Sequence, residues 1–473
     1  MQSYLNFTFV DNTSPVAPYL IEFLPANENP APGSPGKVVG ETFIQQTNGQ
    51  KTLVVSLGEA AKWKSDTFRQ AGGAAAKWLL QNKIELAELN GTSLYKFQLP
   101  DAVSALFEGF KLGAFQFTTY KSDDKPAPTP KVQIRTEDPH GFEKLLHHAQ
   151  ILCDAVNLSR AWSHEPANVI NPITLSERIS VLAAEVGLKC TILDDKALEE
   201  MGAGGIINVG KGSATPSRLI LLEYAGKPST DDPRPVVLIG KAITFDTGGY
   251  SLKGVDNIVN MKYDKCGGIT VAATLAAAAQ LGLRQPMVGI IAASENMVSA
   301  QAYRPDDIIR MLSGKTVEII STDAEGRLVL ADALTYAQQK YTPRVMIDLA
   351  TLTGGVLVAL GRVRGAVMGN SNTLAQSLIV SGDATHELLW QLPMDEDYAK
   401  AIKGDEADIK NSGGREGHSI LGGMFLKEFV KDDVQWAHLD IAAMADTNKE
   451  LPYCPKGATG YGVRLLIHYI ENL

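Results

Sequence analysis

The chain has no run of roughly 18 or more consecutive apolar residues, so we expect no membrane-spanning helix and no membrane partner. Residues 1–6 contain no basic residue and no long apolar stretch, which argues against a secretory signal peptide. The four cysteines are scattered and form no C-x-x-C pair, as is usual for reduced thiols. These absences together predict a cytoplasmic protein.

Excess basic charge is also missing. Lysine and arginine number 44 against 53 acidic residues, which gives a net charge of −9. This balance argues against nucleic acid as the main partner, although a local basic patch is left open. Several catalytic motifs are absent as well: there is no G-x-S-x-G turn, the His-Glu pairs at residues 164 and 386 do not continue into H-E-x-x-H, and the eight histidines form no cluster.

The chain does have length and apolar content. With 473 residues, 45% of them hydrophobic, it can form two or more domains with substantial cores. Residues 1–138 are expected to form a smaller N-terminal α/β domain, and residues 139–164 a connecting helix. From residue 165 to 473, apolar strand-like runs alternate with helical ones, which predicts a larger α/β domain with a mixed, largely parallel central sheet.

The most informative stretch is residues 321–328, S-T-D-A-E-G-R-L. The β-branched run at 316–320 predicts a strand before it, and residues 328–337 predict a helix after it. The two acids, Asp323 and Glu325, therefore belong at the carboxyl end of a strand, where α/β sheets bind ligands. A solvated turn is the alternative interpretation, since Asp and Gly favour turns.

A second acidic stretch lies at residues 241–264, again after a strand. It includes Gly248-Gly249, where the lack of side chains lets the backbone approach a ligand closely. The two stretches together hold four carboxylates and three cations: Asp246, Asp264, Asp323 and Glu325, with Lys241, Lys253 and Arg327. Clustered carboxylates repel one another unless cations compensate, and two divalent ions would do so. Such a pair can polarise a carbonyl and generate hydroxide.

Oxygen ligands favour Mn or Mg, and Zn also accepts carboxylates. A network of surface salt bridges is the alternative for the same residues. A Mg-dependent phosphohydrolase is the rival enzyme, although no dedicated phosphate loop accompanies the acids.

Residues 321–328 resemble the N-T-D-A-E-G-R-L signature of the leucyl aminopeptidase family (cytosol aminopeptidase, M17), with Ser321 in place of Asn. Residues 237–249 and 261–264 are similar to its two metal-binding stretches, and residues 165–168, 350–354 and 438–442 resemble further blocks. The similarity covers roughly residues 140–473. The first 130 residues are compatible with the family's more variable N-terminal domain.

The resemblance implies a metallopeptidase catalytic domain at 165–473 and removal of unblocked N-terminal residues, with Leu and other apolar residues preferred. It also implies two divalent ions per subunit (Mn or Zn, with Co and Mg as alternatives), a bicarbonate ion, peptide substrates and a homohexamer in the cytoplasm. A DNA-binding or scaffolding protein is the non-enzyme alternative, because some family members have such a second role.

The resemblance also implies roles residue by residue. One metal would bind Asp246, Asp323 and Glu325, and the other Lys241, Asp246, Asp264 and Glu325. Lys253 matches the lysine that polarises the scissile carbonyl, and Arg327 the arginine that holds bicarbonate as general base. The positions matching the substrate-binding residues are Met261, Asp264, Thr351, Leu352, Gly354, Ala442 and Ala445.

Two positions depart from the family pattern. Gly254 follows Lys253 where proline is usual, which suggests a more flexible loop. Ala445 stands where some members carry methionine, which suggests a wider pocket for the first residue of the substrate.

Overall fold

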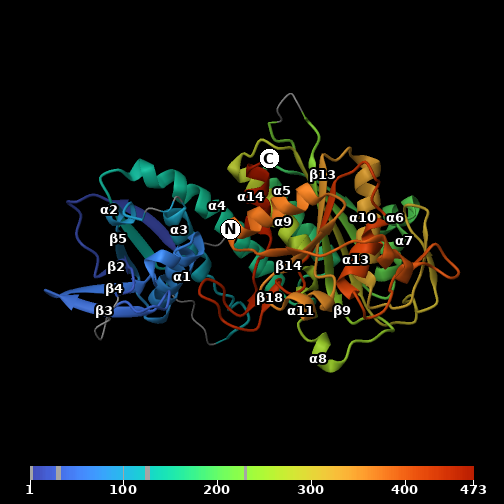
Figure 1. The fold of residues 1–473 in the computed structure, drawn as a ribbon, viewed down its shortest axis with the longest axis horizontal. Coiled ribbons are helices and arrows are strands. Elements are labelled where there is room, and N and C mark those ends of the chain that lie inside the picture. The colour runs from blue at the N-terminus through green and yellow to red at the C-terminus, as the bar shows by residue number, and fades with distance from the viewer. Residues whose placement is uncertain (1–3, 28–33, 98, 100, 123–127, 228–231) are drawn as a thin grey trace. The chain divides into compact units, whose positions relative to one another are not determined.

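The computed structural model describes residues 4–27, 34–97, 99, 101–122, 128–227 and 232–473 (Figure 1). The chain forms two compact units. The first contains Met1–Leu158 and Asn448–Gly457, and the second contains Ser159–Thr447 and Ala458–Leu473. The long helix α4 (Pro139–His164) contributes residues to both. The domain boundaries expected after residues 138 and 164 stay a prediction.

The first unit contains a six-stranded sheet in the order β1-β6-β5-β2-β4-β3. Its neighbouring strands are parallel except for β4 and β3, which pair antiparallel. Its strands are β1 (Asn6–Val10), β2 (Tyr19–Leu24), β3 (Thr42–Thr47), β4 (Gln50–Ser56), β5 (Leu86–Asn90) and β6 (Lys131–Arg135). The short elements are η1 (Ala60–Lys62) and α2 (Gly91–Leu94). Helices α1 (Ser65–Gln81) and α3 (Ala102–Gly113) pack together and bury Phe68, Phe107 and Phe110 in its core.

The second unit is built on an eight-stranded mixed sheet in the order β15-β14-β17-β13-β9-β10-β8-β7. Its four central strands, β17, β13, β9 and β10, are parallel, and antiparallel pairs flank them. The strands are β7 (Lys189–Leu193), β8 (Arg218–Tyr224), β9 (Val236–Asp246), β10 (Met287–Asn296), β13 (Val345–Ala350), β14 (Gly365–Gly369), β15 (Leu389–Gln391) and β17 (Trp436–Asp440). The expected α/β class with a mixed, largely parallel sheet is confirmed.

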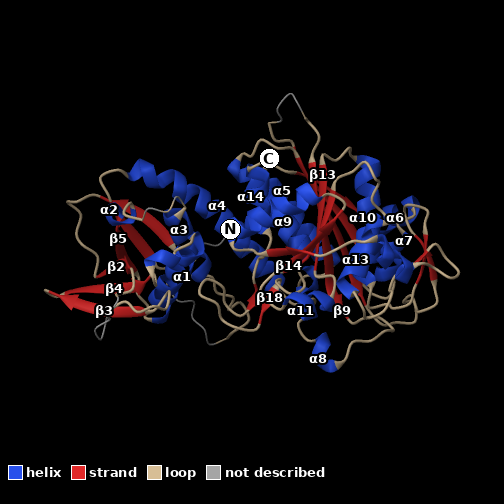
Figure 2. Ribbon diagram, in the orientation of Figure 1, coloured by secondary structure: helices blue, strands red, loops and turns tan. Residues whose placement is uncertain are grey.

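Helices cover both faces of this sheet (Figure 2). On β9, Ile239 belongs to the core that contains Leu328 and Leu330 of α10 (Glu325–Lys340). The next residue, Gly240, faces the other way, because a Cβ there would lie 2.5 Å from Gly268 of α9 (Cys266–Leu281). Further helices of this unit are α5 (Pro172–Val186), α6 (Asp195–Met201), α7 (Gly204–Gly210), α12 (Asn372–Thr385), α13 (His418–Lys427) and α14 (Val463–Glu471).

The strand expected at residues 316–320 is shorter and lies elsewhere than predicted. It is β12 (Thr316–Glu318), which pairs with β11 (Ile308–Arg310) and β16 (Ile409–Lys410) in a separate three-stranded sheet. Strand pairing ends early because the N–H groups of Ile320 and Ser321 donate to the Asn411 side chain instead.

The remaining short elements are α8 (Val255–Ile258), η2 (Met261–Lys265), α11 (Gly354–Leu360), η3 (Glu396–Ile402), β18 (Asp446–Thr447) and β19 (Gly457–Ala458). Among the residues described, no helix combines the length and hydropathy that a bilayer crossing requires.

Candidate metal centre

Strand β9 places two of the predicted ligands in the middle of the sheet. Lys241 lies within the strand and Asp246 is its last residue, and each is only 2% exposed. The parallel neighbour β10 ends beside it, and Asn296 of β10 donates from Nδ2 to Asp246 Oδ1 at 2.8 Å. The site therefore lies at the carboxyl ends of parallel strands, as the sequence predicted.

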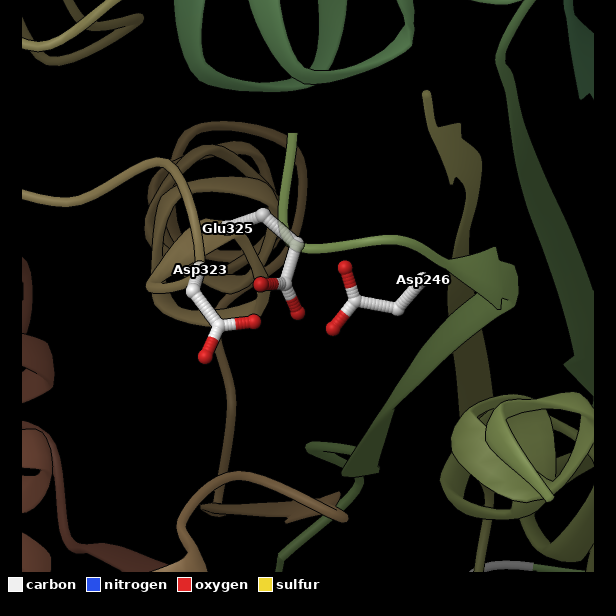
Figure 3. Close-up of side chains that lie close together, drawn as sticks. All are labelled: Asp246, Asp323 and Glu325. Carbon is white, nitrogen blue, oxygen red and sulfur yellow. The ribbon is translucent and has the colours of Figure 1, made fainter. Parts of the chain in front are cut away.

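The other carboxylates come from the segments after β9 and β12. Asp264 lies in η2, Glu325 is the first residue of α10, and Asp323 lies in the loop before that helix. Figure 3 shows the carboxylates of Asp246, Asp323 and Glu325 turned toward one another. Ligand oxygens of these three residues lie within 4.8 Å of one another, so the structure brings together side chains 77 and 79 residues apart in sequence (246 to 323 and to 325).

Two lysines neutralise the carboxylates. Lys241 Nζ lies 2.8 Å from Glu325 Oε1 and 2.9 Å from Asp264 Oδ1, and it also donates to the Thr351 carbonyl at 2.9 Å. Lys253 Nζ lies 2.9 Å from Asp246 Oδ2 and contacts Asp323 as well. Each lysine thus bridges two acids.

Burial and the charges of neighbouring groups shift the pKa values of the acids and lysines in this cluster. Burial raises the pKa of Asp246 and of Asp264 above the ordinary range, and the charge of Glu325 adds to the effect. Burial alone would lower the pKa of both lysines, but the adjacent carboxylates outweigh it and raise both pKa values. With no other cation present, the lysines are therefore ammonium ions that balance the acids.

The donor set fits divalent cations. Glu325 Oε2 and Asp264 Oδ2 are buried, and among the described residues neither has a hydrogen-bond partner. A buried carboxylate oxygen without a partner is costly unless something else satisfies it, and a metal ion does. The structure brings Asp246, Asp323 and Glu325 together as one group, and Lys241 links Asp264 to Glu325.

Arg327 is buried two residues into α10, with 2% of its surface exposed. Its Nη1 donates to the Asn411 carbonyl at 2.7 Å, whereas its Nε is buried and has no partner among the described residues. Burial lowers the pKa of Arg327 to about 10, which still leaves it charged at neutral pH. A buried guanidinium with free N–H donors suits a small planar anion such as bicarbonate.

The predicted substrate-binding residues come from three segments near these ligands. Met261 lies in η2, and Thr351 donates from Oγ1 to Asp264 Oδ1 at 2.7 Å. Leu352 and Gly354 follow β13, and Ala442 and Ala445 follow β17, the strand beside it. Ala445 and Asp264 are buried, with 3% and 7% of their surface exposed, whereas the other members are at least partly exposed.

Sequence reasoning assigned no role to three buried polar residues of this region. Asn296 links Asp246 to the Thr322 carbonyl, the residue before Asp323. The Asn411 side chain accepts hydrogen bonds from the N–H groups of Ile320 and Ser321, and its backbone carbonyl accepts one from Arg327. Asp440 accepts hydrogen bonds at the ends of β13 and β17. Of the three, only Asp440 fell within a block noted for its resemblance, and in that block only Ala442 was given a role.

Comparisons with known proteins identify related chains. The family model described as "Cytosol aminopeptidase family, catalytic domain" matches residues 157–467, and the corresponding N-terminal domain model matches residues 26–124. A probable cytosol aminopeptidase of Geobacter sp. (strain M21) is 42% identical over 448 residues, covering 92% of this chain and 89% of that protein.

More distant relatives follow the same pattern. The cytosol aminopeptidase of Rickettsia prowazekii (strain Madrid E) is 37% identical, covering 89% of this chain and 85% of that protein. Among solved structures, "Bottromycin maturation enzyme BotP in complex with Mn" is similar with a TM-score of 0.88 and 31% identity, covering 96% of this chain and 99% of that one.

Proposed function

Because this chain belongs to the cytosol aminopeptidase family, we propose that it is a leucyl aminopeptidase that removes unblocked N-terminal residues from peptides by two-metal-assisted hydrolysis. The observation that carries the proposal is the cluster of Asp246, Asp264, Asp323 and Glu325, which two lysines balance. Asp264 and Glu325 each have a buried oxygen with no partner among the described residues.

The proposed ligands of one divalent ion are Asp246, Asp323 and Glu325, and those of the other are Lys241, Asp246, Asp264 and Glu325. When bound, such ions supply Lewis-acid polarisation of the scissile carbonyl and a nucleophile at neutral pH. Mn is favoured by the oxygen-rich donor set and by the Mn complex of the BotP structure, with Zn, Co and Mg as alternatives.

The two lysines have different proposed roles. Lys241 is the more buried and touches two ligands of the same ion, so it must become neutral to act as a ligand itself. Lys253 neutralises Asp246 and Asp323, and a cation on these carboxylates would compete with that pairing. Its ammonium would then be free to donate to the carbonyl oxygen, where negative charge develops in the transition state.

Arg327 is proposed to hold bicarbonate, which would serve as the general base. Its Nε has no partner among the described residues, which supports the assignment, because an anion would satisfy that donor. The backbone carbonyl of Asn411 fixes the other end of the guanidinium, so the fork has a defined orientation.

Substrate selection is proposed to depend on the amine and the first side chain. The free α-amine would bind beside Asp264, which excludes blocked peptides. Met261, Thr351, Leu352, Gly354, Ala442 and Ala445 offer no charged side chain, so apolar first residues such as Leu or Met should be preferred over Asp or Glu.

The assembly and location are carried over from the family as proposals. We propose a homohexamer in the cytoplasm that acts on peptides. A secondary nucleic-acid role is disfavoured by the net charge of −9.

The decisive experiment compares Leu-Gly with N-acetyl-Leu-Gly after loading the protein separately with Mn, Zn, Co or Mg. Release of leucine from the unblocked dipeptide alone is expected. Cleavage of both peptides, or of neither with any metal, would overturn the aminopeptidase proposal. A panel of fluorogenic aminoacyl substrates then ranks the first residues, and strong selectivity for Asp or Glu would contradict the pocket assignment.

A further inference from the structure

Asp440 lies at the junction of the two segments that carry most of the proposed first-residue pocket. It is the last residue of β17, opposite Ala350 at the end of β13, and it has no exposed surface. The pocket residues that follow these strands are Thr351, Leu352 and Gly354 after β13, and Ala442 and Ala445 after β17.

Both oxygens of the Asp440 carboxylate accept hydrogen bonds from these segments. Oδ1 accepts from the backbone N–H groups of Leu352 and Ala442, each at 3.2 Å, and from that of Thr353 at 3.5 Å. Oδ2 accepts from the Thr353 hydroxyl at 2.6 Å. One buried carboxylate therefore fixes the separation of the two strand-end segments.

An ionised carboxylate suits this position because it only accepts hydrogen bonds and has room for several donors. The Thr353 hydroxyl also lies 2.8 Å from the hydroxyl oxygen of Ser419 on α13. An asparagine amide would keep the acceptor for the backbone groups and donate to the Thr353 hydroxyl, which would then donate to Ser419. Alanine would leave the backbone donors without an acceptor.

We propose that Asp440 is a positioning residue that sets the spacing of the pocket walls and thereby the preference for a large first side chain over a small one. The proposal rests on the aminopeptidase function and pocket proposed above. An apolar pocket discriminates by the methylene groups that its walls contact, whereas a small first residue barely reaches them. Looser walls should therefore weaken binding of Leu substrates more than that of Ala substrates.

The test measures kcat and KM for Leu and Ala p-nitroanilides in Mn-loaded Asp440→Ala and Asp440→Asn. In Asp440→Ala the Leu-to-Ala ratio of kcat/KM is expected to fall by about tenfold or more, mainly through the KM for Leu. Asp440→Asn should keep the ratio within about threefold of the wild type, because it keeps the hydrogen-bonded links. A uniform loss of kcat for both substrates with an unchanged ratio would overturn the proposal.

Asp332 supplies a matched control. It is also fully buried and also accepts backbone hydrogen bonds, from Ile206 at 3.0 Å and Leu312 at 2.9 Å, but it binds neither pocket segment. Asp332→Ala should lower the melting temperature and leave the Leu-to-Ala ratio unchanged. An equal change of the ratio in Asp332→Ala would show a general effect of destabilisation and overturn the role of Asp440.

Hydrogen exchange provides a measurement that is independent of activity. Peptides that cover residues 350–355 and 440–446 should exchange faster in Asp440→Ala than in Asp440→Asn or Asp332→Ala. Unchanged protection there would contradict the proposal. If the wild type hydrolyses neither nitroanilide, the aminopeptidase function fails, while these exchange rates still decide whether Asp440 holds the two segments together.

Thr353 gives a milder variant in case Asp440→Ala does not fold. Thr353→Val removes the hydroxyl donor to Oδ2 but keeps the backbone N–H, and Thr353→Ser restores the hydroxyl. The Leu-to-Ala ratio should fall in Thr353→Val and recover in Thr353→Ser. The same ratio in both variants would count against the proposal.

Discussion

The Lys241 side chain lies directly against the backbone of Gly326. A Cβ at Gly326 would be 2.6 Å from both Cε and Nζ of Lys241, closer than side-chain carbons approach one another. The lysine reaches Glu325 and Asp264 only because the second residue of α10 has no side chain. A single glycine thus allows the strand lysine and the helix carboxylate to meet.

Gly326→Ala should therefore displace Lys241 and weaken cation binding, even though alanine is the better helix former. We expect the Mn concentration for half-maximal activity to rise, with partial recovery at excess Mn. Gly254→Ala is the control, because a Cβ at Gly254 meets nothing within 4 Å. Similar Mn dependence in the Gly326 and Gly254 variants would contradict this account of the close contact.

Metal content should follow the two proposed ligand sets. Purified protein is expected to hold up to two divalent ions per chain, because the two proposed ligand sets share Asp246 and Glu325. Elemental analysis gives the stoichiometry, and removal of the ions by a strong chelator should abolish peptidase activity. Full activity in a verified metal-free sample would rule out the two-metal mechanism.

Replacing Lys241 and replacing Lys253 should have different effects on metal content and on kcat. Lys241→Ala should lower the metal content, with activity partly restored by excess metal. Lys253→Ala should keep both metals and lose roughly 10²–10³-fold in kcat, by analogy with the loss of one oxyanion donor. Arg327→Ala should keep the metals and lose less if free bicarbonate substitutes. Metal content and kcat measured on the same samples decide the matter, and the opposite pattern would mean that the two lysine roles are reversed.

Asp332 should make stability depend on pH. Burial raises its pKa to about 7 from an ordinary value of 3.8. Between these values the unfolded chain releases the proton while the folded chain retains it, so the stabilisation present below pH 3.8 is lost as the pH rises toward 7.

The amide introduced by Asp332→Asn does not titrate, so the stability of the wild type relative to this variant should fall by about 1.4 kcal/mol per pH unit within that window. Denaturant unfolding of both proteins at pH values across the window measures the difference. Stability curves that stay parallel would show that Asp332 does not titrate there.

The sequence by itself determined the fold class and identified the acidic stretches of the candidate site. Apolar strands that alternate with helices can be buried only in a mainly parallel sheet with helices on both faces, and the β9–β10–β13–β17 core has that form. Asp246 ends a strand of the central sheet, where the sequence placed it. Asp323 and Glu325 follow β12, which belongs to another sheet, so their approach to Asp246 could not be derived from sheet order.

Only the tertiary structure decided which lysine pairs with which carboxylates. Lys241 and Lys253 are 12 residues apart in the sequence, but they bind different carboxylates. The Lys241 side chain passes over the backbone of Gly326 to reach Glu325, whereas Lys253 lies in the loop after Asp246. The early end of β12 depends on Asn411, about 90 residues away in sequence. Asp440 acquires its hydrogen bonds only where β13 and β17 end side by side. These contacts join segments distant in sequence, so no local pattern of residues specifies them.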